Sequence, residues 1–95
     1  MFNKIEASSA SLAQYAVELN GFIGRVSAKI ADLAQYHKKM GNSWQDRLYD
    51  EFGAEMDKIK DIMIRELTTL EELKRKIVSK AQTLAEIEKT NFGGG

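Results

Sequence analysis

Apolar residues recur every seven positions along the first forty residues of the chain. One row consists of Ile5, Leu12, Leu19, Val26, Leu33 and Met40, and a second row, offset by four, consists of Ser9, Ala16, Ile23, Ile30 and His37. Two such rows form the contact stripe of a helix that packs at a shallow angle against a neighbouring helix. The spacing therefore predicts a helix over residues 6–39, and no proline interrupts it.

The pattern stops at residues 40–43, which we interpret as a turn. Gly41 is suited to ending a helix. Asn42 or Ser43 can cap the next helix, and Ser43, with Asp46 three residues later, resembles a capping box. A connection this short makes the two helices antiparallel neighbours.

A second helix is predicted from residue 43 to about residue 90. Its first row is Tyr49, Met56, Met63, Leu70, Ile77 and Leu84; its second is Phe52, Ile59, Leu73 and Ile87, with Leu67 and Ala81 taking up the contact beside Glu66 and Lys80. Residues 91–95, including Gly93–Gly95, are expected to form a flexible tail.

These elements predict a single all-α domain over residues 1–95, an antiparallel two-helix hairpin. The hairpin leaves further apolar residues flanking its contact stripe, and burial of each is worth roughly 1.5–3 kcal/mol. We therefore expect a four-helix bundle, formed as a homodimer or as a heterodimer with a similar hairpin. The predicted partner face consists of Tyr15, Phe22, Tyr36, Ile62, Leu67 and Val78.

Composition narrows the possible functions. Fourteen basic residues balance fourteen acidic ones, which is not the footprint of a nucleic-acid binder. No apolar run approaches the roughly 20 residues of a membrane span, so membrane insertion is not expected. Cysteine is absent and His37 is the single histidine, so we expect no metal, no cofactor and no enzymatic activity. The N-terminus does not resemble a cleavable signal peptide, which predicts a protein that is cytoplasmic when made and exported, if at all, by another route.

Aromatic residues gather at the predicted turn. Trp44 is expected in the first turn of the second helix, where Trp44, Leu48 and Phe52 share one helical face with Tyr49 at its border. We expect the indole to close the end of the hairpin over the first helix. His37, near the turn, is either a partly wet end of the contact stripe or a pH sensor for dissociation.

Tyr49 and Phe52 follow Trp44 by five and eight residues. This arrangement resembles the turn motif of the WXG-type helical hairpins exported by type VII secretion systems. The resemblance covers the whole chain in length and layout, but Asp46 stands where that family has glycine. That family's export signal, a tyrosine followed four residues later by an acid near the C-terminus, is also absent.

The resemblance implies a non-enzymatic interaction module. It would be a substrate of such a secretion system, or a targeting or chaperone partner that docks on the helical domain of a larger secreted effector. The alternative is a structural or regulatory coiled-coil subunit of a cytoplasmic assembly with no role in export.

Overall fold

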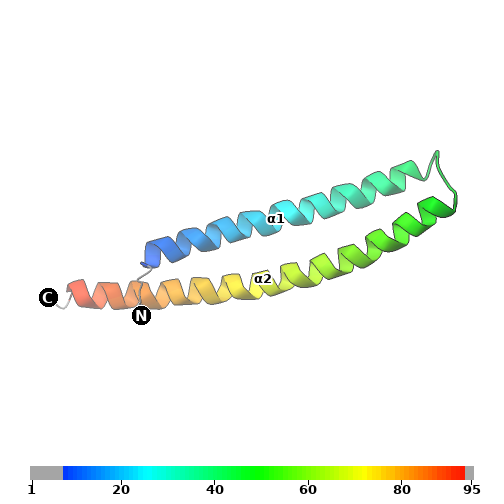
Figure 1. Cartoon of the computed structure of the whole chain (residues 1–95). Coiled ribbons are helices and arrows are strands. Elements are labelled where there is room, and N and C mark those ends of the chain that lie inside the picture. Colours follow the sequence, from blue (N-terminus) through cyan, green and yellow to red (C-terminus); the bar gives the residue numbers. More distant parts are fainter. Residues whose placement is uncertain (1–7, 94–95) are drawn as a thin grey trace, which may run out of the picture. The chain divides into compact units, whose positions relative to one another are not determined.

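The computed structural model describes residues 8–93, and the side chains of residues 8–90. It contains two α-helices, α1 (Ser9–Met40) and α2 (Arg47–Gly93), which pack antiparallel against each other (Figure 1). There is no strand among the described residues. The prediction of an all-α helical hairpin is therefore confirmed.

The chain divides into two compact units. The turn unit is Phe22–Thr69, which holds the second part of α1, the connection and the first part of α2. The terminal unit combines α1 up to Gly21 with α2 from Leu70 onward. Each unit is thus a pair of antiparallel helical segments, and each is described by itself below.

The N-terminus of α1 is fixed by two side chains. Ser8 Oγ accepts a hydrogen bond from the Ser11 backbone N–H at 3.1 Å, which makes Ser8 the N-cap. Glu88 of α2 accepts two bonds from Ser9, from its backbone N–H at 3.0 Å and from its hydroxyl at 2.5 Å. The helix therefore begins at Ser9. The prediction that residue 8 already lies within the helix is wrong, and residues 6 and 7 lie outside the described residues.

The connection between the helices comprises residues 41–46 and differs from the predicted turn. The backbone N–H groups of Ser43 and Trp44 both donate to the Met40 carbonyl, so these residues complete the C-terminus of α1. Asp46 is the N-cap of α2, because its Oδ1 accepts the Tyr49 backbone N–H at 3.1 Å. Asn42 and Ser43 were therefore the wrong choices of cap, and the second helix begins at Arg47 rather than at residue 43.

The far end of α2 also differs from the prediction. The helix continues to Gly93, whereas the sequence pattern ended it at about residue 90. The expected flexible tail is thus wrong for residues 91–93, and residues 94–95 lie outside the described residues.

The least exposed residues of α1 define the seam, the line along which the two helices touch. They are Ser9, Leu12, Ala16, Leu19, Ile23, Val26, Ile30, Ala34 and His37, and the buried Gly41 continues the same line in the connection. Up to Ile30 this is the predicted pattern. Beyond it, Leu33 and Met40 are exposed, and Ala34 and Gly41 take their places. A helix with 3.6 residues per turn drifts out of a strict seven-residue repeat, and a step of four at this point keeps the seam facing α2.

On α2 the first predicted row lies in the seam, with Met63 as its most exposed member. In the second predicted row, Leu67 and Ala81 lie in the seam as expected. The other four members are wrong by one residue: Phe52, Ile59, Leu73 and Ile87 are exposed, and the seam instead contains Gly53, Lys60, Lys74 and Glu88. Small residues allow close approach of the helices, while lysine packs its aliphatic stem and keeps its ammonium in water.

The resulting core is thin. Ala16 and Ala81, at 6% and 8% exposure, are the most buried apolar residues described, and both belong to the terminal unit. Most of the large apolar seam residues are only half-buried. Such a hairpin buries little of its apolar surface within itself.

Candidate partner-binding faces

An aromatic cluster closes the turn unit at the connection. The His37 and Tyr49 rings stack with their centroids 4.1 Å apart, and the centroid of the Phe52 ring lies 5.8 Å from that of His37. The Trp44 indole meets Tyr49 edge-on at 5.3 Å. Tyr49 Oη donates to the His37 carbonyl at 2.8 Å, so one side chain ties the end of α1 to the start of α2.

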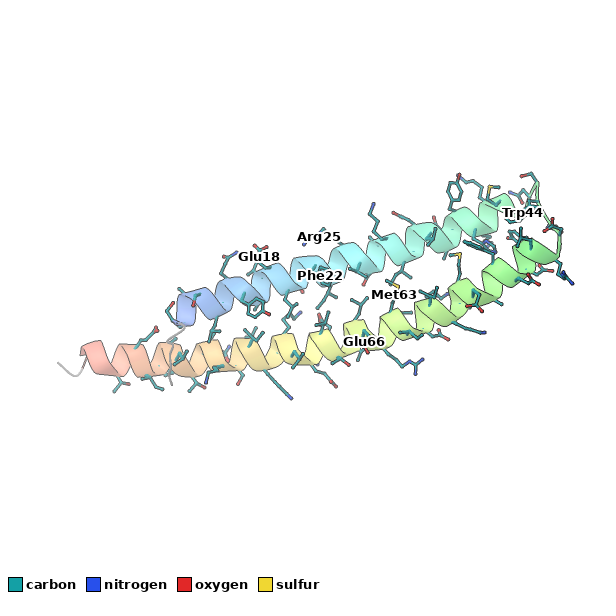
Figure 2. The ribbon with its side chains drawn as sticks, viewed as in Figure 1. Glu18, Phe22, Arg25, Trp44, Met63 and Glu66 are labelled. Atoms are coloured by element: carbon teal, nitrogen blue, oxygen red, sulfur yellow. The ribbon has the colours of Figure 1, made fainter. Side chains whose placement is uncertain are left out.

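Trp44 occupies a different position from the one predicted. It lies in the connection (Figure 2), before the first turn of α2, and therefore does not share a helical face with Leu48 and Phe52. Its indole is half-buried against Tyr49. Leu48 and Phe52 are exposed on α2.

Among the acids that the structure describes, Asp46 and Glu88 are the two whose surroundings favour the charged form. The Tyr49 backbone N–H, and then the Trp44 indole N–H, lower the pKa of Asp46 below its ordinary value of 3.8. The Ser9 hydroxyl and then the Ser9 backbone N–H lower the pKa of Glu88 in the same way. Both acids cap helix N-termini, where negative charge also complements the helix dipole.

The seam divides the surface of each unit into two sides. Because the helices are right-handed and antiparallel, the residue immediately before a seam residue lies on one side of the seam in both α1 and α2. The residue immediately after lies on the other side. We call these the preceding side and the following side. The grooves agree with this geometry, since Tyr15, Leu73, Lys76 and Lys80, all on the preceding side, line one groove of the terminal unit.

Near the connection, the preceding side of the turn unit carries a set of exposed large apolar side chains, which we call the apolar face. It consists of Leu33, Tyr36 and Met40 on α1 and Leu48, Phe52, Ile59 and Ile62 on α2. Phe22 is exposed on the same side, but Arg25 and Lys29 separate it from this set. Tyr36 and Leu48 are the most exposed, at 63% and 61%. The following side of this unit differs, because Ser27 and Ala31 line it beside Ile64.

The terminal unit has two unlike sides. On its preceding side a groove of about 310 Å³ has a floor of leucines, with Lys76 and Lys80 at its edge. On its following side a groove of about 590 Å³ is lined largely by alanines, together with Val17 and Val78. Both grooves are open to solvent.

The predicted partner residues separate into three groups. Tyr15, Phe22, Tyr36 and Ile62 are exposed on the preceding sides of their units. Leu67 is half-buried in the seam, and Val78 lies on the following side of the terminal unit. Sequence reasoning placed Leu33, Met40 and Ile59 in the seam, so it missed them as surface residues. A one-residue shift of the second α2 row was the signal that would have found Ile59.

Charged residues also follow the preceding sides. Arg25 on α1 and Glu66 on α2 are exposed in the turn unit (Figure 2), and Glu18 and Lys76 are exposed in the terminal unit. The three ion pairs between described residues are all internal to α2, as in Arg47–Glu51 at 3.5 Å. Within residues 8–90, none of the ion pairs joins α1 to α2.

In the described part of the chain, histidine and acidic residues form no group of three or more able to hold a metal ion. Neither described helix combines the length and hydrophobicity needed to span a membrane. The chain matches no protein-family model, no curated protein and no solved structure.

Proposed function

We propose that this chain is a non-enzymatic protein–protein interaction module that buries the apolar face against another pair of helices and so forms a four-helix bundle. The observation that carries the proposal is the gathering of seven large apolar side chains on one side of the turn unit. Exposed apolar patches of this size mark interaction sites, because each side chain gains roughly 1.5–3 kcal/mol on full burial.

The grooves of the two units favour binding over catalysis. Catalysis needs a concave site that excludes water. The grooves of this hairpin are open, and alanines or leucines line most of their length. Surfaces of that kind suit the side of another helix.

Within this class, we propose a WXG-like role as a substrate or targeting partner of a type VII-like secretion system. Support comes from the spacing of Trp44, Tyr49 and Phe52, and from the contact between the first two. The alternative, a coiled-coil subunit of a cytoplasmic assembly, is favoured by Asp46, whose carboxylate caps α2 where the family has glycine.

Site-specific photo-crosslinking in the cells that encode the chain tests the interaction. A benzophenone amino acid at Tyr36 lies in the apolar face, and the same group at Ile64 on the following side is the matched control. We expect an adduct to a helical protein, or to a second copy, from position 36 and little from position 64. Equal labelling from both positions, or none from position 36, would refute the interaction.

Export separates the two candidate roles. A secretion substrate accumulates in the culture medium and depends there on a membrane ATPase of the secretion system. A subunit of a cytoplasmic assembly stays in the cell fraction whether or not that ATPase is present. Retention of the chain and of its crosslinked partner in the cell would overturn the secretion role and leave the interaction itself standing.

A further inference from the structure

We infer that the leucine-floored groove on the preceding side of the terminal unit binds an acidic amphipathic helix of a partner protein. We call this groove, of about 310 Å³, the lysine groove, because Lys76 and Lys80 form its edge. It lies in the terminal unit, whereas the apolar face belongs to the turn unit. The inference therefore concerns a second surface and goes beyond the proposed function.

The floor of the lysine groove is apolar and incompletely covered. Tyr15 and Leu73 stand beside the floor and are 57% and 45% exposed. Covering such side chains with another apolar surface releases water and is favourable. The floor itself consists of four half-buried seam residues, Leu12, Leu19, Leu70 and Ile77.

The backbone around the groove selects a helix as the occupant. Both walls are α-helices, so their N–H and C=O groups at this level are bonded within each helix and cannot pair with an extended strand. A helical partner satisfies its own backbone groups and needs to supply an apolar stripe. From Leu70 to Lys80 the groove follows α2 for about 15 Å, or nearly three turns of a docked helix.

The two lysines determine the charge of the partner helix. Lys76 and Lys80 are exposed one turn apart on α2, and like charges at this spacing repel each other. Within residues 8–90, neither lysine forms an ion pair. Glu72 lies one turn before Lys76, but the positions one turn before and after Lys80 hold no acid. Acids on a docked helix, about four residues apart, pair with both lysines and relieve their repulsion.

Glu18 determines which flank of the partner helix is acidic. It is exposed on the preceding side of α1, and its carboxylate accepts a hydrogen bond from Gln14 of the same helix at 3.0 Å. An acid docked above α1 meets this like charge, whereas an acid docked above α2 meets Lys76 and Lys80. The partner helix therefore carries its acids on the flank above α2, and neutral or basic residues on the flank above α1.

The charges favour a helix over an anionic membrane as the occupant. Basic segments that bind such membranes carry clusters of about four to eight lysines and arginines. Two basic residues line the lysine groove, and the acidic Glu18 is exposed on the same side of the unit. Two bases beside an apolar floor match one flank of one helix.

Two synthetic peptides test the charge of the partner. Each has about 21 residues, or three heptads, with one stripe of leucines and with glutamine along one flank of the stripe. The other flank carries glutamates in the first peptide and lysines in the second. The fluorescence anisotropy of a dye on the peptide measures the dissociation constant at low salt. We expect the wild-type chain to bind the glutamate peptide at least about tenfold more tightly than the lysine peptide.

Charge reversal in the groove should exchange this preference. In a double variant with Lys76→Glu and Lys80→Glu, the lysine peptide becomes the tighter ligand. Lys89→Glu is the matched control and should keep the wild-type preference, because Lys89 is exposed in the same unit and lies outside the groove. Circular dichroism checks that each variant is as helical as the wild-type chain. Equal binding of the two peptides by the wild-type chain, or an unchanged preference in the double variant, overturns the inference.

Further outcomes separate the lysine groove from the apolar face. Weaker binding of the glutamate peptide by Tyr36→Ser, with no effect of the double lysine variant, would place the peptide on the apolar face and overturn the inference. Lysine-dependent binding to phosphatidylglycerol vesicles, without binding of the glutamate peptide, would overturn it in favour of a membrane. Crosslinking from position 36 tests the apolar face alone. The proposed function therefore stands if the lysine groove fails, and the peptide preference supports the lysine groove even if position 36 forms no adduct.

Discussion

Gly53 offers a sharp test of how closely α1 and α2 approach in the turn unit. It lies in α2 at the seam, and a Cβ added there would come 2.8 Å from Nε2 of His37, inside van der Waals contact. Gly24 of α1 is its natural control, because a Cβ there meets nothing within 4 Å. Both glycines are inside helices, so the gain in helix propensity on substitution by alanine is the same, roughly 1 kcal/mol.

The two substitutions should therefore have opposite effects on the free energy of unfolding. Gly24→Ala is expected to raise it by about 0.5–1 kcal/mol. Gly53→Ala has the same gain, but the imidazole must move away from its stack on Tyr49, an overpacking cost of about 1–3 kcal/mol. The net effect is a loss of up to about 2 kcal/mol.

Urea unfolding followed by far-ultraviolet circular dichroism measures both effects, at one fixed chain concentration so that association does not enter the comparison. In a His37→Ala background the added Cβ has room, and Gly53→Ala should then stabilise as Gly24→Ala does. That double-mutant cycle assigns the loss to the imidazole. Equal stabilisation by Gly53→Ala and Gly24→Ala in the wild-type chain would show that the helices are not in contact at this level.

Three further substitutions test the ends of the helices. Tyr49→Phe removes the hydroxyl bond to the His37 carbonyl and should lower the free energy of unfolding by about 1 kcal/mol in the same urea assay. Ser8→Ala removes the N-cap of α1 and should lower it by about 0.5–2 kcal/mol, whereas Ser8→Asp should not. Asp46→Asn keeps a capping oxygen but cannot titrate. Because the pKa of Asp46 is lowered in the folded state, the wild-type cap is fully stabilising above the ordinary value of 3.8 and weakens as pH falls through the lowered value. The variant should thus be less stable than wild type at pH 6 and lose less stability on acidification to about pH 2.5; an equal loss in both would contradict the assignment.

Hydrophobic periodicity was enough to predict two antiparallel helices, because the seam of α1 up to Ile30 and the first row of α2 repeat every seven residues. It was not enough to place the connection. Ser43 and Asp46 are both good N-caps, and the choice depends on which backbone N–H groups the end of α1 takes up. Those bonds, from Ser43 and Trp44 to Met40, become visible only in the folded chain.

The second row of α2 failed for a different physical reason. A hydrophobic pattern ranks residues by their free energy of transfer from water, so it placed Phe52, Ile59 and Leu73 in the seam. The seam accepts residues by how well they fit between the helices. The positions one residue later hold Gly53, Lys60 and Lys74: glycine allows close approach, and lysine covers the seam with its aliphatic stem. Sequence alone cannot separate an apolar row that packs within the chain from one that packs on a partner.

That displacement links folding to association. If Phe52 and Ile59 packed in the seam, the hairpin would be more stable alone and would have little left to bind with. Because Phe52 and Ile59 lie one residue before the seam, they are exposed on the same side as Leu33 and Tyr36. The apolar side chains that the core lacks are therefore those that form the apolar face. Whatever covers that face supplies a large share of the burial that folding requires. Under the proposed function, the stability of this chain depends on the concentration of its partner. If that partner is a second copy, the melting temperature of the wild-type chain should rise with chain concentration.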